Sequence, residues 1–259
     1  MRAVTATKDK RRVISCVLVI FLAVQGCAIF HSGEKEWYPV RGISHNVEIT
    51  SSIKPDSAMA SEVKTYRTIL NRDLGKKIGY ARDAFKSTGV ESGLYNLVAD
   101  ALRIQISLSL GKHIDMAVMS PSSIKYYIPR GPITLELVDE ILPYVNKIVL
   151  MKLTGRQITQ LANDIAADGG GVPVSGLRMV ISGSTGTAND LLVGQYIVEP
   201  DSIYTVATSQ YLADGGGHYS VLWKNNRREI LTMTTRDALQ SYIEDRGQIS
   251  PVLDGRIRK

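Results

Sequence analysis

Two short runs of glycine are the first places where this sequence could carry chemistry. Residues 169–171 and 215–217 each hold three consecutive glycines, and bare backbone N–H groups at a helix start can bind phosphate. A Walker loop continues with Lys and then Ser or Thr, whereas VP and HY follow the two runs here. We therefore expect turns in which glycine supplies positive φ, and no phosphate cradle.

The spacing of residues also gives no support for a metal site or for a serine nucleophile. No two histidines occur in an HxH or HExxH arrangement, and no GxSxG motif is present. Asp100 interrupts an otherwise apolar helical face, and we expect it to be a buried hydrogen-bond partner for a loop rather than a catalytic acid. The sequence therefore predicts no metal site in this chain. The four histidines are scattered at His31, His45, His113 and His218.

The elements that must position these residues follow from hydrophobic periodicity. Apolar residues recurring every three or four positions predict helices, and short apolar runs predict strands. Ser92 is expected to cap the second helix and Gly111 to end it. Strands and helices mix without a regular βαβ repeat, so we predict an α+β fold with a mixed β-sheet and packed helices. The expected helices are residues 56–74, 92–111, 134–142, 157–167 and 236–247; the expected strands are residues 113–120, 147–153, 177–182, 195–198 and 202–209.

Five stretches, taken in order, resemble the C-terminal domain of bacterial 5′-nucleotidases. Each one alone is a weak signal, but five in the right order are specific, and the resemblance covers residues 56–258. It implies the fold of that domain, which supplies substrate recognition beside a separate N-terminal metallophosphatase domain. The stretches are ESGLYNLVADALR, IPRGPITLELVDEILPYVNKIVLMKLTGRQI, VSGLRMVI, YTVATSQYLADGGGHY and LQSYIEDRGQISPVLDGRI.

The resemblance implies a substrate site built on two aromatic rings that sandwich a base. In this sequence PYVN supplies Tyr144 and Asn146, and QYLADGGG supplies Tyr211 with the turn residues Gly215 and Gly216. Both rings are present, as tyrosines. A nucleoside or nucleotide is therefore the expected small-molecule partner.

The polar half of the site departs from the family pattern. The stretch SPSSIK replaces the family's glycine pair with Pro and Ser, and it carries Lys125 where the family has arginine. A lysine keeps the charge but loses the bidentate fork. Gly217 stands where an aspartate is expected to bind the ribose hydroxyls, and no arginine corresponds near Ala84 and Thr88. An alternative interpretation is therefore a degenerate structural or interaction module in which Tyr144 and Tyr211 are ordinary tyrosines.

The catalytic half of the family is not expected in this chain. Two-metal hydrolysis needs a dense set of ligands around two divalent ions, and the stretch from Cys27 to Asp56 has no room for it. The two metal ions are therefore expected in a separately encoded metallophosphatase partner. Hydrolysis by this chain alone, through a novel site, is the least supported interpretation.

The N-terminus has the pattern of a secretory signal. Basic residues precede an apolar run at residues 13–26, VISCVLVIFLAVQG, which is too short to span a bilayer comfortably. The run ends VQGC, which resembles the bacterial lipobox and predicts lipidation of Cys27. An uncut signal anchor and ordinary secretion remain alternatives.

These features predict three segments and a location. Residues 1–26 are a lipoprotein signal peptide, residues 27–55 a tether, and residues 56–259 the 5′-nucleotidase C-terminal-like domain. The chain is expected to be lipid-anchored in a bacterial cell envelope. Ala28 lacks the aspartate that resembles an inner-membrane retention signal, so the outer membrane facing the periplasm is favoured.

Charge gives no reason to expect a nucleic-acid partner. Five basic residues and one acid in the first twelve positions account for +4 of the formal charge of +6, which leaves +2 for the remainder. The chain has only two cysteines, Cys16 and Cys27, so the segment after Cys27 can form no internal disulfide. The stability of the segment after Cys27 must therefore come from the burial of apolar side chains in a core.

Overall fold

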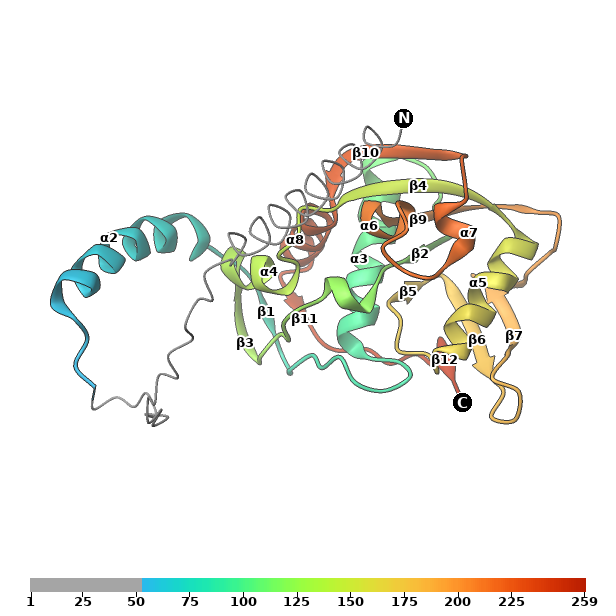
Figure 1. The fold of residues 1–259 in the computed structure, drawn as a ribbon, viewed down its shortest axis with the longest axis horizontal. Helices are drawn as coiled ribbons and strands as arrows, with labels where there is room; N and C mark the ends of the chain where they lie inside the picture. Colours follow the sequence, from blue (N-terminus) through green and yellow to red (C-terminus); the bar gives the residue numbers. More distant parts are fainter. Residues whose placement is uncertain (1–52) are drawn as a thin grey trace, which may run out of the picture. The chain divides into compact units, whose positions relative to one another are not determined.

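The computed structural model describes residues 53–259. The chain divides into two compact units, and nearly all described residues belong to the second, Pro55–Lys259. The predicted signal segment, Cys27 and most of the tether lie outside the described residues. Three sheets with packed helices form the described fold (Figure 1), which confirms the predicted α+β class. Within this part of the chain, no helix combines the length and hydrophobicity that crossing a bilayer requires.

A five-stranded sheet is the centre of the fold. Its order is β10-β4-β9-β2-β5. β2 runs parallel to β9, while β4 runs antiparallel to β9. Two of the predicted strands, residues 147–153 and 202–209, are therefore paired neighbours. The strands are β10 (Arg228–Thr234), β4 (Lys147–Thr154), β9 (Ile203–Ser209), β2 (Met116–Val118) and β5 (Val174–Ser175).

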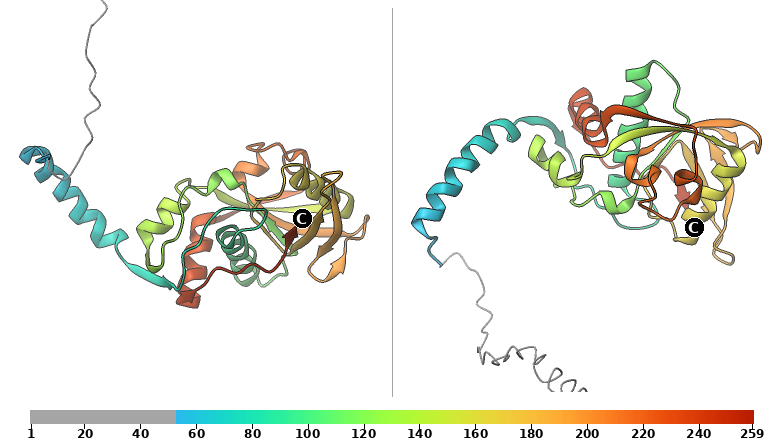
Figure 2. Two further views of the ribbon diagram at one scale, coloured as in Figure 1. Left: turned by 90° about the horizontal axis from the view of Figure 1, so that it is seen from below. Right: turned by 45° about the horizontal axis from the view of Figure 1, so that its top comes forward.

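Both faces of this sheet are buried at its central strands, while the edge strand β10 is largely exposed. Successive residues of β2 point to opposite sides, so Ala117 joins one apolar core and Met116 and Val118 join the other. The first core contains residues of α3 (Gly93–Leu110), α4 (Leu135–Ile141) and α8 (Thr235–Arg246). The second contains α5 (Gly155–Ala167), α6 (Gln210–Ala213) and α7 (Ser220–Trp223). Figure 2 shows α3 and α5 on opposite sides of the strands. Burial on both faces explains why residues 116–119, which contain β2, form a continuous apolar run.

Two smaller sheets flank the central one. The three-stranded sheet has the order β11-β1-β3 and the four-stranded sheet the order β12-β6-β7-β8. The strand β8 is an open edge, and its two residues, Tyr196 and Ile197, are exposed to 82% and 73%. The strands are β11 (Gln248–Ile249), β1 (Lys77–Ala81), β3 (Gly131–Thr134), β12 (Ile257–Arg258), β6 (Leu177–Ile181), β7 (Ala188–Val193) and β8 (Tyr196–Ile197).

Local sequence signals set the helix ends, and those predicted for α3 are confirmed, whereas α5 and α8 begin at Gly155 and Thr235, slightly before the predicted starts at residues 157 and 236. The Ser92 hydroxyl accepts a hydrogen bond from the Tyr95 N–H, and Gly111 ends α3 in the left-handed conformation with φ 59°. Capping boxes at Thr154 and Thr234 begin α5 and α8. The predicted first helix is α2 (Ser57–Leu74), whose first turn is capped by the Asp56 carboxylate.

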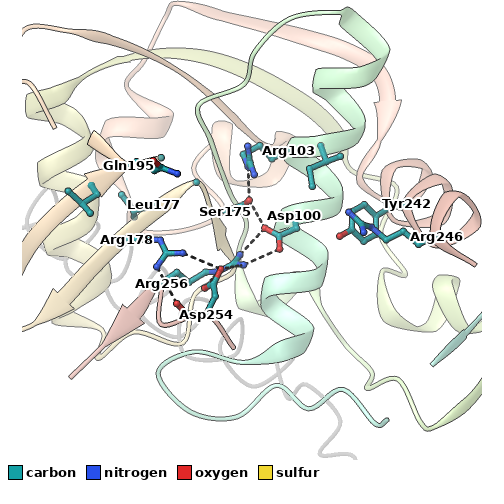
Figure 3. Close-up of a pocket in the computed structure, with 14 residues that line it drawn as sticks. Asp100, Arg103, Ser175, Leu177, Arg178, Gln195, Tyr242, Arg246, Asp254 and Arg256 are labelled. Carbon is teal, nitrogen blue, oxygen red and sulfur yellow. Dashed lines mark hydrogen bonds and ion pairs between the residues drawn. The ribbon is translucent and has the colours of Figure 1, made fainter. Parts of the chain in front are cut away.

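A buried ion-pair network attaches the C-terminal segment to the body of the domain. All five N–H groups of Arg256 are used: they donate to both oxygens of Asp100, both oxygens of Asp254 and the carbonyl of Val174. Ser175 donates to the same Asp100. Figure 3 shows this cluster between α3 and the C-terminal segment. Asp100 is thus a hydrogen-bond partner for the C-terminal segment, as the sequence predicted, but its side chain is 23% exposed and so only partly buried.

The charges in this network stabilise one another. Burial by itself would lower the pKa of the Arg256 guanidinium, but Asp100 and Asp254 outweigh burial and raise it. Burial raises the pKa of Asp254, yet the hydrogen bonds and charge of Arg256, with Arg178 nearby, leave it below its usual range. Asp254 therefore stabilises the fold above pH ~4, and this contribution is lost as pH falls through its lowered pKa.

Replacing Arg256 tests how strongly the network holds the fold. Arg256→Met leaves the Asp100 carboxylate, which is 23% exposed, without its main partner. Breaking a fully buried pair costs about 3–5 kcal/mol, and solvent access to Asp100 places the expected loss at or below the lower end of that range. Urea unfolding should show a midpoint well below that of the wild type. Arg258→Met is the matched control, because Arg258 is an exposed arginine only two residues further along the chain, in β12. Equal losses for the two variants would show that the network is not a stability determinant.

Candidate functional site

Three chain segments meet at one end of the central sheet. β2 and β9 run parallel and β4 runs against them, so the ends of β2 and β9 lie beside the start of β4. Lys125 follows β2 after the short helix η1 (Pro121–Ser123), Tyr144 and Asn146 precede β4, and Tyr211 follows β9. The structure therefore brings the predicted site residues Lys125, Tyr144, Asn146 and Tyr211 to the same end of the central sheet, which we call the aromatic edge. Ligand binding by these residues stays a prediction.

Lys125 and Tyr144 lie side by side at this edge. The Lys125 N–H donates to the Ile141 carbonyl at 2.9 Å, which ties the segment after β2 to the end of α4. The Lys125 ammonium nitrogen lies 5.6 Å from the centre of the Tyr144 ring, within the range of a cation–π contact. The Tyr144 side chain is 53% exposed. A flat, solvent-accessible ring with an adjacent positive charge suits an aromatic ligand that carries negative charge.

Tyr211 is positioned by the glycine turn. The Gly216 N–H donates to the Tyr211 carbonyl at 2.7 Å, and a Cβ at Gly216 would lie 2.3 Å from atoms of the Tyr211 ring. The ring therefore lies across the bare backbone of Gly216. Gly215 adopts a positive φ of +97°, which favours glycine. At Gly216 glycine is needed for a different reason, because a side chain there would collide with the Tyr211 ring. Tyr211 remains 43% exposed.

Asn146 contributes to this edge through its backbone. Its N–H donates to the Tyr144 carbonyl and its carbonyl accepts from the Thr235 N–H, each at 2.9 Å. These bonds fix the loop before β4 against the start of α8. Among the described residues, the rings of Tyr144 and Tyr211 do not pack on each other. Both rings are therefore available at this edge, as stacking on a base would require.

A cavity of about 270 Å³ lies beside the glycine turn and joins it to the other glycine run. Asp168, just before Gly169, places one carboxylate oxygen 3.1 Å from His218 Nε2 and accepts a hydrogen bond of 2.9 Å from the Tyr219 hydroxyl. Burial, followed by the Asp168 hydrogen bond, raises the pKa of Tyr219, so this hydroxyl stays protonated as a donor. Burial also raises the pKa of Asp164, against the lowering effect of His218.

Sequence reasoning missed the Asp168–His218 pair. The available signal was that each glycine run has a titratable neighbour, Asp168 before the first and His218 after the second. Ser120, Ser122 and Gly217 line the same cavity. A carboxylate, an imidazole and hydroxyl groups can exchange hydrogen bonds with the hydroxyls of a sugar.

The described residues do not fit a dimetal centre. Within residues 53–259 no group of three or more His, Cys, Asp or Glu side chains could hold a metal ion. The groups that the described residues offer at this edge are two aromatic rings, the Lys125 ammonium and the hydrogen-bonding groups beside the glycine turn.

Comparison with known proteins defines the class to which this fold belongs: C-terminal domains of larger enzymes. Residues 76–224 match the family described as 5′-nucleotidase, C-terminal domain, and the chain belongs to that family. The 5′-nucleotidase of Vibrio vulnificus is 25% identical over 229 residues, which is 83% of this chain but 39% of that protein. Endonuclease YhcR of Bacillus subtilis is 23% identical over 80% of this chain and 17% of its own length. The chain thus spans well under half of the curated relatives it matches.

Solved structures agree with this assignment. A 5′-nucleotidase precursor from Thermus thermophilus aligns with a TM-score of 0.68 and 25% identity, over 79% of this chain and 43% of that one. The sulfate thiohydrolase SoxB of the same organism aligns with a TM-score of 0.61 at 16% identity, over 78% of this chain and 38% of that one. The latter likeness shows the fold alone. The predicted family is confirmed.

A Cβ at Gly216 tests the geometry of the Tyr211 ring. Gly216→Ala forces the ring to move, but the ring is half-exposed, so we expect an unfolding free energy within about 1.5 kcal/mol of the wild type. Near-ultraviolet circular dichroism should change in the tyrosine region. Gly183→Ala is the control, because nothing lies within 4 Å of a Cβ there. A tyrosine signal that Gly216→Ala leaves unchanged would contradict this packing.

Proposed function

We propose that this chain binds a nucleoside or nucleotide between Tyr144 and Tyr211 and so serves in nucleotide hydrolysis as the substrate-recognition part. The observation that carries the proposal is the convergence of both tyrosines and Lys125 at one edge of the central sheet. The chain's membership of the 5′-nucleotidase C-terminal family gives that edge its expected ligand class. Base stacking on aromatic side chains contributes about 1–3 kcal/mol per base.

Catalysis in this proposal belongs to a metallophosphatase encoded separately. Relatives such as the 5′-nucleotidase of Vibrio vulnificus extend well beyond the region that this chain matches. The residues between 53 and 259 offer no ligand set for a metal ion. We assign the two divalent ions to the partner, with this chain presenting the base and sugar to it.

The proposed location is the bacterial cell envelope, with the chain held by a lipid on Cys27. The support is the basic segment, the short apolar run and the VQGC sequence. One acyl chain binds a membrane only marginally, and stable anchoring needs further lipid or charge. The outer membrane facing the periplasm is the favoured surface.

A second candidate is an interaction module that keeps the fold without the ligand. The observation that favours it is the exposed apolar surface near the same edge, which includes Tyr126, Tyr127 and Val145 as well as Tyr144. Lys125 and Gly217, where the family pattern has arginine and aspartate, favour it too. Nucleoside binding separates the two candidates.

Nucleoside binding should depend on Tyr211. The full chain, purified in detergent, should gain thermal stability from at least one member of a panel of adenosine, uridine and their 5′-monophosphates. A ligand at about 100 times its Kd adds roughly 2.7 kcal/mol. Tyr211→Ala should weaken binding about 5- to 150-fold, the equivalent of about 1–3 kcal/mol. Tyr196→Ala, an exposed tyrosine on the distant edge strand β8, should bind like the wild type. No response to any ligand would favour the interaction module.

Lipidation should depend on Cys27 and not on Cys16. In a bacterial host fed an alkyne-labelled fatty acid, the wild-type chain should carry the label, since the thiol after the predicted cleavage site is acylated. Cys27→Ser should abolish the label. Cys16→Ser, inside the predicted signal, should keep it. Label on the Cys27→Ser chain, or none on the wild type, would overturn the lipid assignment.

A further inference from the structure

A second cavity, of about 680 Å³, opens at the other end of β2. Ser175 in β5 pairs with Ala117, and the neighbouring Gly176 packs so closely on the Asp115 carbonyl that a Cβ there would lie 2.1 Å from its oxygen. This end is where β2 begins, whereas Lys125 follows the end of β2. The walls come from α3, from the segment spanning β5 to β7, from α8 and from the C-terminal segment (Figure 3).

The cavity carries an excess of positive charge. Four arginines and two aspartates line it, and the buried Glu91 carboxylate lies 4.0 Å from Arg256 behind the lining, so four cations against three carboxylates leave an excess of one positive charge. The carboxylates of Asp100 and Asp254 are already occupied by Arg256, and Arg178 lies 3.8 Å from Asp254. The positive charge that is left belongs to Arg103 and Arg246.

Arg103 is held in place by a chain of hydrogen bonds. Its Nε–H donates to the Ser175 hydroxyl at 2.7 Å, and that fully buried serine donates to Asp100, which Arg256 fixes from the other side. The two terminal amino groups of Arg103 form no hydrogen bond to another described residue. A guanidinium fixed through Nε presents its outer N–H groups as a planar fork.

Arg246 supplies the second cation from α8. Its guanidinium lies 4.4 Å from the centre of the Tyr242 ring, and Tyr242 is only 9% exposed. Gln195 adds an amide to the lining, and Ile104, Leu177 and Leu192 add an apolar wall. Figure 3 shows the Arg246 and Tyr242 side chains together beyond Asp100.

We infer that this cavity binds the phosphate group of a small organic phosphate, with Arg103 and Arg246 as its ligands. Planar guanidinium groups bind phosphate oxygens through paired N–H donors, which a lone ammonium cannot do. The volume lies within the range of small-molecule sites. The apolar wall would contact the organic part of the ligand. This site is distinct from the aromatic edge and does not depend on nucleoside binding there.

Titration of the full chain in detergent with inorganic phosphate, at constant ionic strength, tests the inference. Saturable binding should appear by calorimetry, and the NMR signals of the arginine Nε–H groups should shift. Arg103→Gln should weaken binding at least tenfold. Arg130→Gln removes the same charge from an exposed arginine that lines neither cavity, and it should bind like the wild type. Tyr211→Ala should also bind phosphate normally, which separates this result from the proposed nucleoside site.

Three outcomes would overturn the inference. The wild type would show no saturable phosphate binding, Arg103→Gln would bind as tightly as the wild type, or acetate would bind as tightly as phosphate. If Arg103→Gln lowers the melting temperature, Arg246→Gln provides the same test, because Arg246 lies outside the hydrogen-bond chain. Phosphate binding that both single variants leave intact would equally reject the site.

Discussion

The pairing of β4 with β9 is the interaction on which the rest of the domain depends. The two strands stay in register from Ile148 opposite Ser209 to Thr154 opposite Ile203. Both strands send side chains into both cores: Ile148, Leu150 and Ala207 join one, and Val149, Met151 and Val206 join the other. A slip of one residue would exchange the two faces and place every side chain in the wrong core. The loop that carries Tyr144 and the short helix that carries Tyr211 extend from the paired ends of these two strands, so the pairing fixes their relative position.

The elements that the sequence predicted well are those whose signals are local. Ser92 and Gly111 act within one turn of helix, and the apolar residues of β4 and β9 reflect burial on both faces. The strand β1, with the sequence KIGYA, and the strand β3, GPIT, lack an alternating pattern and contain Gly or Pro. The strand β10 is largely exposed. Such strands form because partners distant in the sequence offer them hydrogen bonds, which no short window can reveal.

The same distinction applies to the candidate site. The two tyrosines and Lys125 were found because the family pattern marks their positions. The contact between Asp168 and His218 was missed because two turns far apart in the sequence create it. The sequence predicts that Asp100 accepts hydrogen bonds, but its partner Arg256 lies near the C-terminus, and periodicity gives no means of pairing them. The position of a functional side chain is therefore easier to predict than the distant residue that it contacts.

The open edge at β8 has a consequence for how this chain meets other chains. An exposed strand is a template on which another strand can add through main-chain hydrogen bonds. Here the edge is only two residues long, and its apolar side chains, Tyr196 and Ile197, are exposed. So few main-chain groups cannot hold a neighbouring strand in register, which limits amyloid-like growth in a crowded compartment. The brevity of β8 thus protects solubility where its side chains alone would favour aggregation.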